Sequence, residues 1–167
     1  MYQQGCQVVY GIHGVCNVLP SETRKIDRKT VEYYVLQPLE QPETRYYVPI
    51  QNAVAVSRIR PVMTRLEADA LLQSADTCCV DWIEDENLRK QQYKALIGNG
   101  DRSALLGMIS LLYRRKKEQL SAGKKFHSSD ENFLRDAEKL ICGELSVVLN
   151  MSSREVCVYL QSKLGAE

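Results

Sequence analysis

The residues of this chain that could carry catalysis are few and poorly grouped. Its two histidines, His13 and His127, lie in different halves of the sequence, and no glycine-rich phosphate loop, H-E-x-x-H or G-x-S-x-G motif accompanies them. Carboxylates are numerous, but they gather at the starts of predicted helices, where they stabilise the helix dipole without chemistry. We therefore expect a protein that is not an enzyme.

Cysteines are the other reactive side chains, and the chain has six of them: Cys6, Cys16, Cys78, Cys79, Cys142 and Cys157. No C-x-x-C pair occurs, so we predict no metal site and no cofactor. We expect small, mostly buried thiols that stay reduced. A thiol redox sensor built on the adjacent Cys78 and Cys79 is a further interpretation, although the nearby acidic residues disfavour the thiolate.

Positive charge is concentrated in one segment. The whole chain has a formal net charge of +1, whereas residues 87–129 contain ten basic residues and two acidic ones, a net charge of +8. A basic face of this kind suggests a polyanionic partner, although a solvated helix surface is the alternative. Within it, the loop at residues 120–126 combines a glycine with Lys124 and Lys125, which suits contact with a phosphate.

Trp82 is the only tryptophan, and it directly follows Asp81, a predicted helix cap. The sequence leaves two interpretations open. The ring is either an anchor of the core or an exposed wedge that enters the minor groove of DNA and unstacks a base step. Residues 84–86 are acidic and would repel phosphates, so the basic residues would have to approach DNA from the other side of the ring.

Helical periodicity begins at Thr64. Three capping boxes are predicted, at Thr64 with Glu67, Ser128 with Glu131 and Ser152 with Glu155, and Asp81 and Asp101 are predicted single-residue caps. The predicted helices cover about residues 64–75, 82–97, 102–118, 129–149 and 153–163. Apolar stripes such as Leu105, Met108, Ile109 and Leu112 predict the core of a helical bundle.

The first part of the chain has the pattern of short strands. Residues 8–10, 31–36 and 46–48 are rich in β-branched and aromatic residues, and glycines and prolines separate them. We predict an α+β protein of two domains, with a small five-stranded β-barrel at residues 1–62 and an all-α bundle at residues 63–167.

The composition is that of a folded protein, with 44% hydrophobic and 26% charged residues. No apolar run approaches the roughly 20 residues that cross a bilayer, and the N-terminus lacks the pattern of a signal peptide. We therefore expect no membrane partner and a cytoplasmic location.

Taken in order, these residues resemble the CarD/CdnL family of bacterial transcription regulators along nearly the whole chain. The motifs that carry the resemblance are residues 5–14, 32–36, 47–52, 81–82, 100–101, 111–113, 120–126 and 137–150. Each motif is weak alone, but their order and spacing are specific.

The resemblance implies a Tudor-like barrel that binds the β subunit of RNA polymerase. It also implies a helical domain that contacts promoter DNA at the upstream edge of the bubble. Arg24 and Tyr47 fall at the polymerase contact. Tyr47 stands where a basic residue is common in the family, and Arg45, two residues earlier on the same strand face, is the expected replacement.

On the DNA side, the resemblance assigns the wedge to Trp82 and the backbone-contacting loop to Lys124 and Lys125. From the basic segment we add three further DNA-binding candidates, Arg89, Lys90 and Arg114.

We thus predict a monomeric, nucleoid-associated regulator that stabilises the open complex. It would dock on polymerase and contact promoter double-stranded DNA through the minor groove and phosphates, with weak sequence specificity. The alternative is a protein-only adaptor that binds polymerase or a coupling-factor partner, with Trp82 in the core. Binding of random duplex DNA by residues 64–167 at low salt would distinguish the two.

Overall fold

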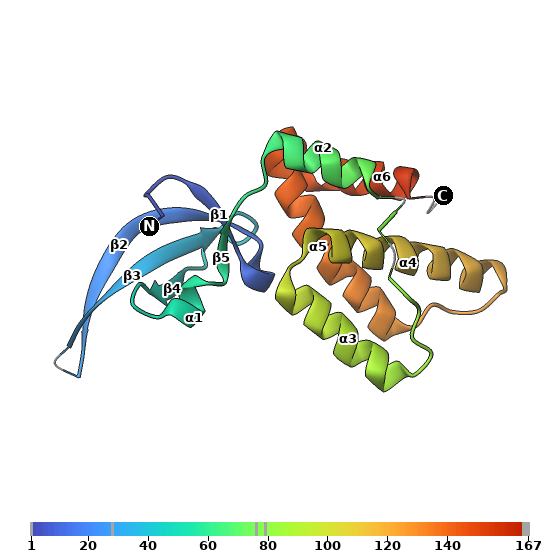
Figure 1. Ribbon diagram of the computed structural model, residues 1–167, viewed down its shortest axis with the longest axis horizontal. Coiled ribbons are helices and arrows are strands. Elements are labelled where there is room, and N and C mark those ends of the chain that lie inside the picture. Colours follow the sequence, from blue (N-terminus) through green and yellow to red (C-terminus); the bar gives the residue numbers. More distant parts are fainter. Residues whose placement is uncertain (1, 28, 76, 79, 165–167) are drawn as a thin grey trace. The chain divides into compact units, whose positions relative to one another are not determined.

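The computed structural model describes residues 2–27, 29–75, 77–78 and 80–164 (Figure 1). The chain divides into two compact units, Met1–Val62 and Met63–Glu167. The division falls where the sequence pattern changes from strands to helices.

The first unit is built on a five-stranded sheet in which all neighbours are antiparallel, in the order β4-β3-β2-β1-β5. Its strands are β1 (Gln7–Tyr10), β2 (Val15–Ile26), β3 (Lys29–Pro38), β4 (Tyr46–Pro49) and β5 (Ile59–Pro61). A sheet unit followed by a helical unit confirms the α+β class. Among the described residues β4 and β5 are not paired, so the sheet is open and the predicted closed barrel is not confirmed.

Two short helical segments complete the sheet unit. The 3-10 helix η1 (Gly11–His13) joins β1 to β2, and α1 (Ala53–Val56) joins β4 to β5. The Asn52 side chain caps α1 by accepting a hydrogen bond from the Ala55 amide. Four residues are too few to show helical periodicity, so α1 was not predicted from the sequence.

The strands β2 and β3 form a long hairpin, drawn as two long curved ribbons in Figure 1. Their register shifts between Leu19 and Glu22, where Pro20 lies. Proline has no N–H to give to the ladder, which accounts for the irregularity at this point. The sheet packs its apolar face into a small core of Val8, Cys16, Val18, Tyr34, Leu36, Val48 and Ile59.

The second unit contains five helices, and none of its described residues forms a strand: α2 (Arg65–Gln73), α3 (Glu86–Asn99), α4 (Arg102–Ser121), α5 (Ser128–Leu149) and α6 (Ser153–Lys163). The capping boxes predicted for the starts of α2 and α6 are both present. The Asp101 cap of α4 is also confirmed, because its Oδ1 accepts from the Ala104 amide at 2.7 Å.

Two predicted helix starts were wrong. The helix expected from residue 82 begins at Glu86, and its cap is Asp85, whose Oδ1 accepts from the Leu88 amide at 2.7 Å. The Arg89 side chain binds the carbonyl oxygens of Ile83 and Glu84, which accounts for the later start. At α5, Ser128 is already helical, and the capping residue, His127, makes no side-chain cap.

The core of the helical unit follows the predicted stripe on α4. Leu105, Met108, Ile109 and Leu112 are all fully buried. Glu144 on α5 is also buried, and its Oε1 accepts hydrogen bonds from the Met63 amide at 2.8 Å and from Arg102 Nη2 at 2.7 Å. This carboxylate therefore ties the start of the unit to both α4 and α5.

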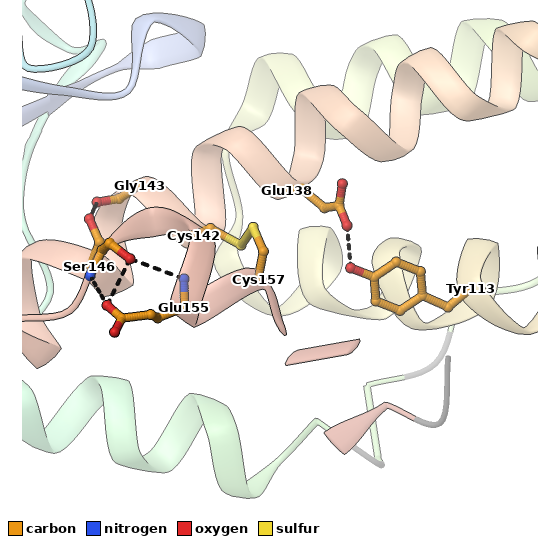
Figure 2. The surroundings of a disulfide bond; sticks show 8 residues. Tyr113, Glu138, Cys142, Gly143, Ser146, Glu155 and Cys157 are labelled. Atoms are coloured by element: carbon orange, nitrogen blue, oxygen red, sulfur yellow. Dashed lines mark hydrogen bonds between the residues drawn. A yellow bond between two sulfur atoms is a disulfide. The ribbon is translucent and has the colours of Figure 1, made fainter. Parts of the chain in front are cut away.

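A disulfide joins Cys142 on α5 to Cys157 on α6 (Figure 2). The expectation that all thiols stay reduced was wrong for this pair, because helix packing brings together two cysteines that lie 15 residues apart in sequence. Cys16 follows the expectation, since burial raises the pKa of its thiol to about 11. Cys78 is half-buried, while Cys79 lies outside the described residues.

No helix in the described part of the chain has the length and apolarity needed to cross a bilayer. Within the same residues, no three His, Cys, Asp or Glu side chains are grouped so that they could hold a metal ion.

Candidate functional site

The sheet unit presents an arginine on an aromatic ring. Arg24 on β2 reaches across the intervening strand β3, so that its Cζ lies 3.7 Å from the ring centroid of Tyr47 on β4. Tyr33 on β3 meets Tyr47 edge to face, with centroids 6.4 Å apart. The strand register therefore brings Arg24 and Tyr47, two predicted polymerase-contact residues, together with Tyr33, which was not predicted as a site residue.

The Arg24 side chain remains open to solvent, with 45% of its surface exposed. Its Nη2 donates to Glu22 Oε2 at 3.2 Å, and this hydrogen bond raises the pKa of the guanidinium above its usual value. An exposed cation already stacked on tyrosine can still bind a carboxylate from a partner.

Arg45 occupies a different position from Arg24 and Tyr47. It lies one residue before β4 and is exposed. In the described part of the sheet unit, no contact joins Arg45 to Arg24 or Tyr47. The prediction that Arg45 replaces the basic residue common at the position of Tyr47 is therefore not supported by a direct contact.

Trp82 lies in the irregular segment between α2 and α3 rather than in the first turn of a helix. Its ring is half-buried and packs against the core cluster of the helical unit. Two guanidinium groups contact it, with Arg89 Cζ 4.3 Å and Arg115 Cζ 4.6 Å from the ring centroid. The ring is therefore neither a fully buried anchor nor a freely projecting wedge.

The prediction that Arg89 binds DNA is corrected by its burial. Only 4% of the residue is exposed, and its Nε and Nη2 donate to the two carboxylate oxygens of Asp130 at 3.0 and 3.1 Å. A guanidinium that is enclosed and bound on both sides of its fork cannot reach a phosphate. Arg89 instead holds the segment that carries Trp82.

The other predicted DNA-binding cations lie on the surface. Lys90 is half-exposed and pairs with Glu86 at 2.6 Å, an interaction that lowers the pKa of the Glu86 carboxyl. Arg114, Lys124 and Lys125 are exposed. Gly123, with φ of +69°, lets the chain turn between α4 and the two lysines.

Consecutive residues near the end of α4 connect the ring to the basic loop. Arg115 contacts Trp82, and Lys116 Nζ lies 5.9 Å from the ring centroid of Phe126, next to Lys125. Lys116 also pairs with Glu131 at the start of α5, at 2.8 Å. The last turns of α4 thus contact both Trp82 and the loop that carries Lys124 and Lys125.

Two residues of this arrangement were not selected as site residues from the sequence. Arg115 belongs to the basic segment, but helical spacing alone does not show that it faces Trp82, because the ring comes from an irregular segment. Asp130 lies in the first turn of α5 and looked like a carboxylate that serves the helix dipole. No sequence pattern links it to Arg89, which lies 41 positions earlier.

Residues 2–63 match the family model described as the CarD-like/TRCF RID domain. The match covers the N-terminal unit and supports the predicted resemblance to CarD-like proteins, whereas the helical unit lies outside it. The match indicates a transcription-related protein with RNA polymerase as a partner. No curated protein matches this chain significantly.

Proposed function

We propose that this protein is a non-enzymatic transcription regulator that docks on the β subunit of RNA polymerase and stabilises the open promoter complex through its helical unit. In this proposal it acts as a cytoplasmic, nucleoid-associated monomer. In this proposal the open sheet binds polymerase, a role that the family resemblance assigns to a Tudor-like barrel.

Polymerase docking is assigned to the face that carries Arg24, Tyr33 and Tyr47. The stacked guanidinium can make a charge-assisted contact with a carboxylate of the partner. Strand β4, at one edge of the sheet, can add a strand-to-strand contact, since an edge strand has backbone groups available for pairing.

DNA contact is assigned to Trp82 and the exposed cations near it. The observation that carries this assignment is that α4 contacts the ring through Arg115 and the basic loop through Lys116. Cations on the loop and on α4 can bind phosphates while the half-exposed ring meets the minor groove. A ring that fits partly melted DNA better than closed duplex shifts the equilibrium towards the open complex.

Weak DNA binding is sufficient in this mechanism. Docking on polymerase raises the effective concentration of the helical unit at the promoter. A free protein with low affinity for duplex DNA is therefore consistent with a strong effect on the assembled complex.

The decisive experiment separates the two units. Arg24→Glu should abolish binding to a polymerase β fragment and leave the DNA affinity of the free protein unchanged, because the two contacts lie in different units. Glu40→Lys is the control, because it changes the charge of the sheet unit by the same amount, in the opposite direction, at another position. Loss of DNA affinity in a folded Arg24→Glu variant would contradict the assignment of the polymerase and DNA contacts to separate units.

A salt titration tests the DNA assignment. With about four phosphate contacts, the slope of log affinity against log salt should be about −3 to −4. Lys125→Ala should weaken binding to all duplexes alike and reduce the slope by about 1, whereas Arg154→Ala on α6 should not. A protein with no salt-dependent affinity for duplex DNA would favour the alternative, an adaptor that binds polymerase or a coupling-factor partner without a DNA wedge.

A further inference from the structure

Trp82 is held by neighbouring side chains although it lies outside regular secondary structure. An indole on an irregular segment would ordinarily sample several rotamers. Here the segment is fixed on both sides of the ring. Before it, Val80 and the Cys78 carbonyl lie so close to α4 that a Cβ added at Gly107 would be 3.1 and 3.0 Å from them. After it, Arg89 binds the backbone.

Arg89 contacts the Trp82 segment in two ways at once. Its Nη1 donates to the carbonyl oxygen of Ile83 at 2.7 Å and to that of Glu84 at 3.3 Å. Its Cζ lies over the Trp82 ring, 4.3 Å from the ring centroid. One side chain therefore restrains both the ring and the backbone that follows it.

Asp130 holds Arg89 in place. Its carboxylate is 1% exposed and accepts from Nε and Nη2 of Arg89. Asp130 lies in the first turn of α5, where the helix dipole stabilises a negative charge. The guanidinium is thus fixed by α5 along one edge and restrains the Trp82 segment with its other edge and its face.

We propose that Arg89, oriented by Asp130, is the positioning residue that sets the Trp82 ring for its contact with DNA. This inference rests on the proposed function for the part that concerns DNA. A ring that must enter a base step loses less conformational freedom on binding when it is already fixed. Lysine could not replace Arg89, because it lacks both the planar face and the fork of donors.

The test removes the ion pair without leaving a buried charge. Arg89→Ala alone leaves Asp130 unpaired and is expected to destabilise the protein. The double variant Arg89→Met/Asp130→Leu replaces both partners by apolar side chains, a change that often leaves stability unchanged. The matched control is Arg65→Met/Asp69→Leu, which removes an exposed pair on α2.

Trp82 is its own probe, because it is the only tryptophan. In the full-length Arg89→Met/Asp130→Leu variant we expect the fluorescence emission to shift to longer wavelength and acrylamide quenching to increase, with the thermal melting temperature retained. The lifetime of the open complex should fall towards its value without the protein, while binding to polymerase persists. The control pair should change none of these quantities.

The outcomes separate this inference from the proposed function. Unchanged emission and quenching in the folded double variant would overturn the positioning role, whatever happens to DNA. A shifted emission with an unchanged open-complex lifetime would also overturn it if Trp82→Ala shortens that lifetime. If Trp82→Ala has no effect either, the proposed function fails, and the fluorescence change still supports Arg89 as the residue that holds the ring.

If the double variant does not fold, Arg89→Lys provides the second test. It keeps the charge beside Asp130 but loses the stacked face and the second arm of donors. The same fluorescence shift and the same loss of open-complex lifetime are expected, and wild-type values in both measurements would overturn the proposal.

Discussion

Each of the two units places an arginine over an aromatic ring, but the two arginines differ in their exposure to solvent. In the sheet unit, Arg24 stacks on Tyr47 at 3.7 Å and remains 45% exposed. In the helical unit, Arg89 stacks on Trp82 at 4.3 Å, but only 4% of it is exposed and a buried carboxylate occupies its fork. Both contacts place a guanidinium over an aromatic ring, but only the Arg24 side chain is exposed to solvent.

Access decides what each arginine can do. The exposed guanidinium keeps donors for a partner, and its own ion pair with Glu22 contributes little to folding. The N–H donors of the buried guanidinium are bound to groups of the helical unit itself, so Arg89 can orient Trp82 but cannot bind a phosphate. A basic residue in a basic segment is therefore not a DNA contact until its burial is known.

The largest expected effect contrasts these two arginines directly. Arg89→Ala should lower the free energy of unfolding by about 3 to 5 kcal/mol, because it leaves Asp130 buried without its partner. Arg24→Ala should leave the free energy of unfolding nearly unchanged, because exposed ion pairs contribute little to stability. Urea unfolding followed by circular dichroism measures both, and equal losses in the two variants would contradict the distinction.

A second contrast concerns the covalent link, which lies within the helical unit. Opening the Cys142–Cys157 disulfide, which closes a loop of 15 residues, should lower the stability of that unit by about 3 kcal/mol. Reduction by dithiothreitol should therefore lower the melting temperature of the helical signal. The Cys142→Ser/Cys157→Ser variant should melt at the reduced temperature and ignore dithiothreitol, and a reductant effect that persists in it would assign the loss elsewhere.

Much of the fold followed from local patterns. Periodicity located α4, α5 and α6, and the caps at Thr64, Asp101 and Ser152 fixed three helix starts because they act through neighbouring backbone amides. The start of α3 was missed because the contacts of one side chain decide it, and that side chain is held by Asp130, 41 positions later in the sequence. Arg89 binds the carbonyls of Ile83 and Glu84, and no local rule gives that preference.

The candidate site was less predictable for the same reason. Family resemblance pointed to Trp82, Lys124 and Lys125 on the DNA side and to Arg24 and Tyr47 on the polymerase side. The charge of the basic segment pointed to Arg89, Lys90 and Arg114. Which cations face solvent depends on packing between helices far apart in sequence, as Arg89 and Asp130 show. The open edge of the sheet was likewise invisible, since strand patterns predict strands but not whether β4 and β5 close on each other.

Substitution of Trp82 should have an intermediate effect on stability, smaller than that of Arg89→Ala. Because the ring is half-buried, Trp82→Ala should cost roughly 1 to 2 kcal/mol, between the losses typical of surface and core positions. Open-complex lifetime should nevertheless fall to its value without the protein, while polymerase binding through Arg24 persists. Thermal melts beside a lifetime assay measure both, and a loss as large as that for Arg89→Ala would make the ring a core anchor.

The smallest expected effect is a pH dependence of the stability of the helical unit. Hydrogen bonds from the Ser152 hydroxyl and amide lower the pKa of Glu155 below its usual 4.5, and the Thr64 amide and hydroxyl do the same for Glu67. A carboxyl whose pKa is lower in the folded state stabilises the fold above its unfolded pKa, and this contribution is lost as pH falls through the folded pKa. The melting temperature of the helical signal should therefore decline below about pH 4.5.

Glu155→Gln tests this contribution, because glutamine can accept the same hydrogen bonds but does not titrate. The variant should show a shallower acid decline than the wild type and nearly the same melting temperature at neutral pH. Glu22→Gln is the matched control in the sheet unit, where the carboxylate pairs with Arg24 on the surface, and it should leave the acid decline of the helical signal unchanged. An acid decline of wild-type steepness in Glu155→Gln would show that this capping box does not contribute to it.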